Sequence, residues 1–202
     1  MIYLYGASGH AKVIIETLEL EQKKVGGLID DNPAIVGLLS YPVFQKFPDS
    51  FDVKKDDLIV SIGGNIIRKK IVNQLSGRFV QSIHPSVNLS KSAVTGLGTV
   101  IMAGVTVNSG SKVGNHVILN TNASIDHDCW IADFAHISPN VALAGHVSVG
   151  EGTHVGIGAC VIQGVKIGKW ATIGAGAVII KDVPDFAVVV GNPGRIIKYN
   201  KF

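Results

Sequence analysis

Histidine is concentrated in one stretch of this 202-residue chain, where it lies beside carboxylates. Five of the seven histidines fall between His116 and His154. The segment Ser124-Ile-Asp-His-Asp128 places one imidazole, that of His127, between two carboxylates. A neutral imidazole beside a carboxylate is the usual arrangement of a general base that works near neutral pH. Solvent-exposed turns also accept His and Asp freely, so the surrounding elements must decide between a base and an ordinary turn.

A strict six-residue repeat runs through this stretch. From Ile101 to Ile179 every sixth residue is aliphatic, which makes 14 consecutive positions without a miss. The residue four places after each of them, from Val105 to Val183, is small. Six residues suit one short strand and a turn, and alternation along the strand puts the aliphatic residue and the small residue two places before it on one inward face. The repeat therefore predicts a parallel β-helix of hexapeptide units.

The repeat resembles that of known hexapeptide-repeat proteins, in which three units make one left-handed triangular coil of 18 residues. Stacked coils pair their strands at a spacing of about 4.8 Å, so residues 18 apart lie above one another. On this ruler His127 stacks on Gly145, and His136 stacks on His154. Both His136 and His154 directly precede an inward aliphatic residue, so we expect their side chains to face outward.

The first 83 residues have a different pattern, in which apolar strands alternate with helical runs. Strands are expected at 2–5, 25–29, 58–62 and 79–83, and helices at 11–20 and 66–75. This alternation implies a small Rossmann-like parallel sheet with right-handed crossovers. The expected joint is His84-Pro85-Ser86, which gives an α/β domain over 1–83 and a β-helix over 84–202.

The turn after the first expected strand, Gly6-Ala-Ser-Gly9, suits a phosphate cradle, because backbone N–H groups and a helix N-terminus favour anions. Its spacing is GxxG and not the GxGxxG dinucleotide fingerprint, which argues against NAD. By itself such a motif is more often a tight turn, and Asp30-Asp31 after the second strand could equally be an ordinary turn.

Composition excludes several classes of protein. The formal net charge is only +3, and the basic residues are scattered apart from Arg68-Lys69-Lys70, so we expect no nucleic-acid partner. The apolar run at residues 1–5 lacks the basic flank and length of a signal peptide, and no stretch reaches the roughly 18 apolar residues of a membrane span. We therefore expect a cytoplasmic protein without a membrane partner. Cys129 occupies a small-residue position of the repeat, which favours a buried free thiol.

Motifs in both halves carry a resemblance to one family. The run from Asn120 to Gly145 (NTNASIDHDCWIADFAHISPNVALAG) is similar to the nucleotide-sugar acetyltransferases of the hexapeptide family. It most resembles the branch of the bacillosamine-pathway and perosamine N-acetyltransferases and the sialic-acid O-acetyltransferases. YGASGH, LIDD and SIGGNIIRKK in the first half resemble the same branch. The resemblance implies acetyl-CoA as co-substrate, no metal, a nucleotide-linked amino sugar (4-amino) as acceptor, and a homotrimer with active sites between subunits.

The resemblance also implies roles for single residues. His127 would be the general base, taking a proton from the attacking amine or hydroxyl, and Asp128, where some relatives carry Glu, would orient its ring. The backbone N–H of Gly145 would stabilise the oxyanion formed on the acetyl group, and His136 would contact acetyl-CoA near the thioester.

Further residues fall where relatives bind their ligands. The pantetheine and adenosine path would pass Ile157 and Ala175, and the run Gly191-Asn-Pro-Gly-Arg195 resembles a turn that closes the coenzyme site. For His146 and His154, a solvated or interface position is the favoured interpretation. The nucleotide-sugar would be bound by Ser8, Gly9, His10, Asp30, Asp31 and Gly63.

Three alternatives stay open. The acceptor could be a hydroxyl of a sugar or of sialic acid, and the nucleotide could be uridine or guanosine. A β-helix carbonic anhydrase would hold a metal with three histidines, one pair of them five residues apart; here the gaps from His116 are 11, 9, 10 and 8. A non-catalytic β-helix scaffold is the third possibility.

Overall fold

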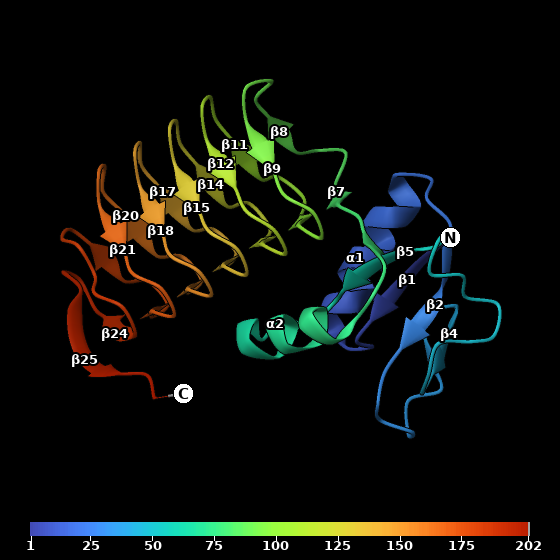
Figure 1. Ribbon diagram of the computed structural model, residues 1–202. Helices are drawn as coiled ribbons and strands as arrows, with labels where there is room; N and C mark the ends of the chain where they lie inside the picture. Colours follow the sequence, from blue (N-terminus) through green and yellow to red (C-terminus); the bar gives the residue numbers. More distant parts are fainter. Residues whose placement is uncertain (202) are drawn as a thin grey trace.

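Short parallel strands, stacked coil upon coil, form most of the molecule, and an α/β part lies at one end of the stack (Figure 1). The structure is a computed structural model and describes residues 1–201. Its fold is the expected left-handed hexapeptide β-helix with a Rossmann-like N-terminal part. None of the helices in this range is long and apolar enough to cross a membrane.

The β-helix consists of two-residue strands that recur every six residues. They are β7 Ser82–Ile83, β8 Asn88–Leu89, β9 Val94–Thr95, β10 Val100–Ile101, β11 Thr106–Val107, β12 Lys112–Val113, β13 Ile118–Leu119, β14 Ser124–Ile125, β15 Trp130–Ile131, β16 His136–Ile137, β17 Ala142–Leu143, β18 Ser148–Val149, β19 His154–Val155, β20 Cys160–Val161, β21 Lys166–Ile167, β22 Thr172–Ile173 and β23 Val178–Ile179. Every third strand belongs to the same sheet, which gives the coil three faces. From Ile101 onward the second residue of each strand is buried in one continuous core.

The 18-residue ruler is confirmed by the strand pairing. His136 pairs with His154, and Ser124 of one coil pairs with Ala142 of the next. The β-helix also begins before the aliphatic repeat that starts at Ile101, since β7 at Ser82 already pairs with β10. At the far end β24 (Ala187–Val190) continues the first face and pairs antiparallel with β25 (Arg195–Tyr199).

Each turn of the coil holds one residue in the left-handed region of φ. This position recurs every six residues and is often glycine, as at Gly110 (φ 72°) and Gly164 (φ 73°). Between these two, in the same corner of successive coils, stand Asp128 (φ 57°) and His146 (φ 59°). Asp tolerates this conformation better than most residues because its short polar side chain bonds locally. The corner geometry thus fixes where these two side chains point.

The N-terminal sheet has the strand order β3-β4-β2-β1-β5-β6, and all its pairs are parallel except β3 with β4. Its elements are β1 Ile2–Tyr5, α1 Gly9–Leu20, β2 Val25–Ile29, β3 Gly37–Leu38, β4 Tyr41–Phe44, β5 Asp57–Val60, α2 Asn65–Gln74 and β6 Arg78–Phe79. The expected strand over 79–83 is wrong as one element. It divides into β6 in this sheet and β7 in the β-helix, because Gln81 turns away to donate to the backbone carbonyls of Thr95 and Gly96.

Helix α1 joins the two parts through an apolar contact. Its buried residues Ile14 and Leu18 belong to the same core cluster as Val100, Met102 and Ile118 of the β-helix. Val100 and Ile118 hold outward positions of their strands, where most other strands carry polar residues. They are apolar because α1 covers them.

Candidate active site

One corner of the β-helix, between strands β14 and β15, carries an imidazole–carboxylate pair. His127 Nδ1 lies 2.8 Å from Asp128 Oδ2, and both side chains are about half exposed. A carboxylate can only accept here, so Nδ1 carries the proton and Nε2 is left as the basic nitrogen. This hydrogen bond raises the pKa of His127 above its ordinary value. The pair has the tautomer that a general base needs.

The second carboxylate of this corner bonds to the backbone, and its charge also helps to raise the pKa of the His127 ring. Asp126 Oδ1 accepts from the His127 N–H at 2.8 Å and from Asn108 Nδ2 at 2.9 Å. His127 thus stands between two carboxylates that have different roles. Asp128 contacts the ring, and Asp126 fixes the turn that presents it.

Gly145 lies beneath the His127 ring on the next coil. A methyl group on Gly145 would stand 2.6 Å from His127 Nε2, so only glycine leaves room for the ring. Backbone hydrogen bonds between successive coils continue at this corner, where the His146 N–H donates to the His127 carbonyl at 3.0 Å. Within residues 1–201 no acceptor is bonded to the Gly145 N–H itself. A basic nitrogen and a free backbone donor thus lie side by side at this corner.

His146 stands on the other side of the same carboxylate. Its Nε2 is 3.8 Å from Asp128 Oδ2, and its ring meets that of His127 edge-on at 5.1 Å between centroids. In the described part of the chain, His127, Asp128 and His146 are the one group of His, Cys, Asp or Glu side chains whose ligand atoms are close enough to hold a metal ion. All three are exposed.

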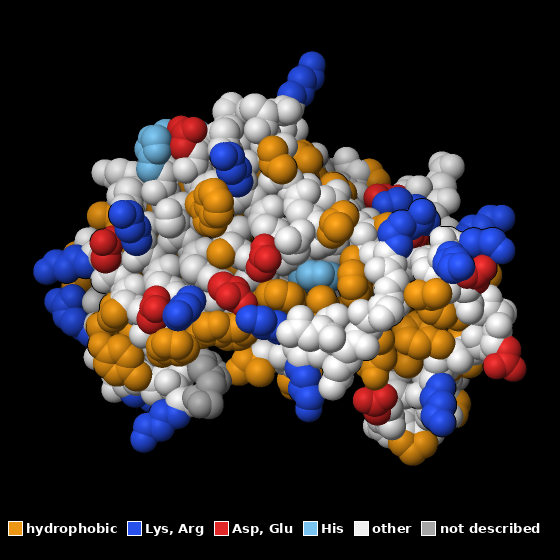
Figure 2. Space-filling model, viewed as in Figure 1, with side chains coloured by type: hydrophobic (Ala, Val, Ile, Leu, Met, Phe, Trp, Pro, Cys, Tyr) orange, Lys and Arg blue, Asp and Glu red, His pale blue; other side chains and the backbone are white. Residues whose placement is uncertain are grey.

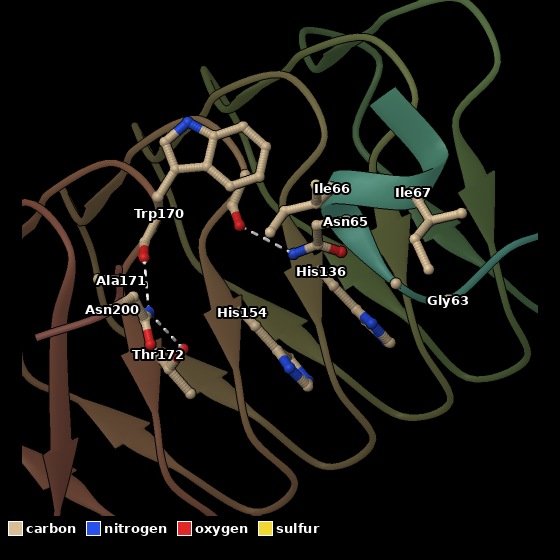
Figure 3. Close-up of a pocket in the computed structure, with 12 residues that line it drawn as sticks. Gly63, Asn65, Ile66, Ile67, His136, His154, Trp170, Ala171, Thr172 and Asn200 are labelled. Atoms are coloured by element: carbon tan, nitrogen blue, oxygen red, sulfur yellow. Dashed lines mark hydrogen bonds between the residues drawn. The ribbon is translucent and has the colours of Figure 1, made fainter. Parts of the chain in front are cut away.

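A second region, a cavity of about 500 Å³, lies between the first face of the β-helix and the N-terminal end of α2 (Figure 3). Its floor is formed by the stacked rings of His136 and His154, whose centroids are 4.8 Å apart. Its lining is completed by Gly63, Gly64, Asn65, Ile66, Ile67, Gly152, Trp170, Ala171, Thr172 and Asn200.

His136 is neutral in this cavity. Burial, followed by the charges of neighbouring groups, lowers the pKa of His136 to about 3, although a hydrogen bond with the Gly63 backbone acts in the opposite direction. Asn120 Nδ2 lies 3.2 Å from His136 Nε2, while Asn120 Oδ1 accepts from the Thr121 N–H. Nε2 is therefore an acceptor, and His136 is suited to hydrogen bonding and not to carrying charge.

The predicted nucleotide-sugar residues gather at the carboxyl ends of three neighbouring strands, β2, β1 and β5. After β1, the chain adds its next strands on one side of β1 and then crosses over to add the last ones on the other side. This reversal of direction is a topological switch point, where sheets of this kind usually bind their ligands. Ser8 and Gly9 open α1, with His10 in its first turn, and Gly63 follows β5. A methyl group on Gly9 or on Gly63 would meet no atom within 4 Å, so both border open space.

The acidic pair after β2 is bonded into this loop cluster. Asp30 accepts from the Ala7 N–H at 2.8 Å, which ties the loop after β2 to the loop after β1. Asp31 accepts from the Tyr5 hydroxyl at 2.9 Å. Both carboxylates shape the rim of the switch point.

One copy of the chain does not bring all of these groups together. His127 lies at the corner after β14, whereas His136 begins β16 on the face toward α2. Ile157 and Ala175 stack at a third place, the corner after β19 and β22, and both are exposed. The switch-point residues adjoin the His136 cavity through Gly63.

Most residues that line or bound the cavity were not expected from the sequence, among them Asn65, Arg68, Trp170 and Asn200. His154 also lines the cavity, where it is exposed. The 18-residue ruler stacks Trp170 on Gly152, but no pattern in the sequence turns the side chain of Arg68 inward. On the face shown in Figure 2, Lys and Arg side chains are interspersed with acidic and hydrophobic ones.

Comparison with known proteins identifies the family. The PglD N-terminal domain matches residues 1–75, and the six-repeat bacterial transferase hexapeptide matches residues 146–181. A mutant of perosamine N-acetyltransferase from Caulobacter crescentus, solved with CoA and GDP-perosamine, is 36% identical. The match covers 98% of this chain and 96% of that one, with a TM-score of 0.90. The chain belongs to the hexapeptide-repeat nucleotide-sugar acetyltransferases, a family of acyltransferases.

Two further relatives support the same family. The acetyltransferase domain of PglB from Neisseria gonorrhoeae FA1090 is 35% identical, with 97% of this chain and 98% of that one covered and a TM-score of 0.89. UDP-N-acetylbacillosamine N-acetyltransferase from Bacillus subtilis (strain 168) is 46% identical over 120 residues, which cover 50% of this chain and 51% of the relative. The chain thus spans about half the length of the curated relatives it matches, or less.

Proposed function

We propose that the protein transfers the acetyl group of acetyl-CoA to the 4-amino group of a nucleotide-linked sugar, with His127 as general base. The observation that carries this proposal is the His127–Asp128 pair, 2.8 Å apart, over the free N–H of Gly145. The relatives support the chemistry, since a mutant of one, a perosamine N-acetyltransferase, is solved with CoA and GDP-perosamine, and another is solved with acetyl-CoA.

The reaction follows from the tautomer of the pair. The sugar amine attacks the thioester carbonyl carbon, and Nε2 of His127 takes the proton that the amine loses as the C–N bond forms. The carbonyl oxygen becomes an oxyanion, which the Gly145 N–H stabilises by a hydrogen bond. When the C–S bond breaks, the CoA thiolate leaves and recovers the proton from the His127 imidazolium. Asp128 holds the ring and stabilises its charged form.

The acceptor would be held by the switch-point loops. The N-terminal end of α1, with free space around Gly9, suits a diphosphate because backbone N–H groups and the helix dipole favour anions. Asp30 and Asp31 would hold the base or ribose, and Gly63 would line the pocket next to the neutral ring of His136. His136 would in turn contact acetyl-CoA near the thioester, and Ile157 and Ala175 would line its pantetheine and adenosine path.

A homotrimer would complete this site. His127 is exposed at one corner of the β-helix, so a closed active site needs protein on the other side of it as well. The acceptor pocket of the same chain lies on a different face. We propose that His127 of one subunit serves the pocket of its neighbour. Mixing two inactive variants, His127→Asn and a pocket-blocking Gly9→Trp, would test this. Regained activity in mixed oligomers supports a site shared between chains, and its absence places base and pocket in one chain.

The activity itself is tested by thiol release from acetyl-CoA against a panel of UDP- and GDP-linked 4-amino sugars, with the matching 4-hydroxy sugars as controls. We expect release with an amino sugar and none with its 4-hydroxy counterpart. Release with free sialic acid or with hydroxyl acceptors alone would overturn the N-acetyl assignment and favour O-acetyl transfer.

A further inference from the structure

A row of stacked backbone carbonyls faces α2. The residues at the left-handed corner position before the first face, 18 apart, are His116, Phe134, Gly152 and Trp170. In the described chain, no backbone N–H is bonded to the carbonyls of His116, Phe134 or Gly152. Because polar groups near the interior need hydrogen-bond partners, these carbonyls need donors from outside the β-helix backbone.

Two side chains of α2 supply those donors. Arg68 donates from Nε to the His116 carbonyl at 2.9 Å and from Nη2 to the Phe134 carbonyl at 2.7 Å. Asn65 donates from Nδ2 to the Gly152 carbonyl at 2.9 Å, a bond drawn in Figure 3. Arg68 Nη2 also donates to Asn65 Oδ1 at 2.9 Å, which fixes the direction of the amide. Arginine and asparagine therefore bind three successive coils as one unit.

The remaining fork of Arg68 holds the loop after β5. Its Nη1 donates to the carbonyls of Ile62 and Gly63 at 2.9 Å and 3.1 Å. Gly63 in turn shares a hydrogen bond with His136. One guanidinium thus connects the pocket loop to the coils that carry His136.

Arg68 is an uncommon residue for this place. Its side chain is 1% exposed, and no carboxylate of residues 1–201 forms an ion pair with it. An apolar side chain of similar volume often costs less to bury than a charge, so a retained buried cation points to a role beyond packing. That role is geometric, since one rigid guanidinium donates to six acceptors in two parts of the fold, five backbone carbonyls and the Asn65 side-chain amide.

We propose that the Arg68–Asn65 pair positions the Gly63 loop against the β-helix, and so sets the width of the acceptor pocket relative to His136. Arg68 and Asn65 are positioning residues and touch no reacting atom. The kinetic part of this proposal rests on the proposed function, because it assigns the Gly63 loop to the acceptor.

The domains do not depend on this pair to stay together. Helix α1 packs its apolar face on Val100 and Ile118, which holds the α/β part in place. In α2 the one buried residue is Arg68, whereas Ile66 and Ile67 are 49% and 55% exposed. Loss of the pair should therefore loosen α2 and the loop locally and leave the rest folded.

Three variants test the proposal. Arg68→Lys keeps the charge and loses the fork, Asn65→Asp keeps the acceptor for Arg68 and loses the donor to Gly152, and Lys70→Met removes an exposed charge two residues further along. Hydrogen exchange of the peptide over 61–75 should become about tenfold faster or more in the first two variants and should stay at the wild-type rate in Lys70→Met. Exchange of the β-helix core should stay at the wild-type rate in all three variants. The KM for the amino-sugar substrate should rise about tenfold in both, with kcat and the KM for acetyl-CoA within about twofold.

Hydrogen exchange tests the positioning role of the pair, and the KM values test its role in the acceptor pocket. Unchanged exchange over 61–75 in Arg68→Lys overturns the positioning role, whatever the enzyme acts on. Faster exchange with equal losses for both substrates makes the pair a structural support only and overturns its role in the acceptor pocket. If wild-type protein transfers no acetyl group to any amino sugar, the proposed function fails, and the exchange measurement still decides the positioning role.

Discussion

The ring of His127 lies over the backbone of Gly145, 18 residues later, with two ring atoms 2.6 Å from where a methyl group on Gly145 would stand. The absence of a side chain on one coil thus makes room for the imidazole of the coil before it. In the proposed reaction the same relationship places the base and the oxyanion donor on one side of the reacting carbon.

Gly145→Ala should therefore damage catalysis by displacing the ring. The added methyl cannot share space with His127, so the ring must rotate away from Asp128 or from the substrate. We expect kcat to fall about 100-fold, the scale of a misplacement of roughly 1 Å, with little change in thermal stability. Gly37→Ala, where the methyl would meet one backbone oxygen at an ordinary 3.6 Å, is the matched control and should leave kcat unchanged.

His127→Asn should remove the base and keep the fold. The residue is exposed, so no core packing is lost, and we expect kcat to fall by about 10²–10⁴, the usual contribution of general-base catalysis. The KM for acetyl-CoA should stay within about twofold. Acetyl transfer at the wild-type rate by this variant would sink the mechanism and favour another base or a scaffold role.

The pH profile should report the His127–Asp128 contact. A general base works unprotonated, so kcat/KM should rise with pH through the pKa of His127, which the Asp128 hydrogen bond holds above the ordinary value. Asp128→Asn removes that contact, so the acid limb should move to lower pH while the plateau rate falls. Full pH profiles of both proteins check this. A limb that stays in place, or moves to higher pH, would contradict the assignment of His127.

Much of the fold could be predicted because its signal is local and repeated. One aliphatic and one small residue every six positions define the inward face, and the 18-residue coil then stacks His127 on Gly145 and His136 on His154. The β-helix predicted over 84–202 starts just after β7 (Ser82–Ile83), which belongs to it because β7 to β9 are held by pairing with later coils. Pairing is a tertiary effect that a short segment does not reveal.

The acceptor pocket could be predicted only in outline. The sequence predicts a helix over 66–75, but in α2 Ile66 and Ile67 are exposed and Arg68 is buried. The reason is the row of unpaired corner carbonyls, which attracts donors and not apolar groups. That row exists only once the coils are stacked, so the sequence of α2 alone gives no signal of it.

Stability should fall between about pH 6.5 and pH 4.5, since His116, which is buried, and His10 and His136, which are partly buried, stay neutral in the folded state. Burial lowers the pKa of His10 and His116 to about 4 and that of His136 to about 3. Above an unfolded-state pKa of about 6.5 these groups are neutral in both states and contribute no slope. Below it the unfolded chain binds protons that the folded chain refuses, so unfolding becomes more favourable as pH falls.

Thermal unfolding across pH 8 to 4.5 measures this effect. The Tm should be flat above about pH 7 and then drop by several degrees, at about 2–4 °C for each kcal/mol in a chain of this size. His10→Gln removes one of the titrating groups and should give a shallower slope, even if its Tm at pH 8 is lower. Equal slopes for the two proteins would mean that His10 has the same pKa in the folded and unfolded states, which would contradict the lowered pKa.

Removal of metal ions should leave acetyl transfer unchanged. His127, Asp128 and His146 place ligand atoms within 4.8 Å of one another, so this corner is where a metal-dependent reaction of the carbonic-anhydrase kind would have to occur. In the proposed mechanism, however, the base is His127 Nε2 and the oxyanion donor is the Gly145 N–H, and both belong to the protein.

Dialysis against EDTA should therefore not lower kcat, and elemental analysis of active protein should find far less than one zinc per chain. His146→Asn removes one of the three candidate ligands and spares the His127–Asp128 contact, so its kcat should stay within about twofold of wild type. Activity that is lost in EDTA, restored by Zn²⁺ and abolished in His146→Asn would replace the metal-free mechanism with a metal-dependent one at the same corner.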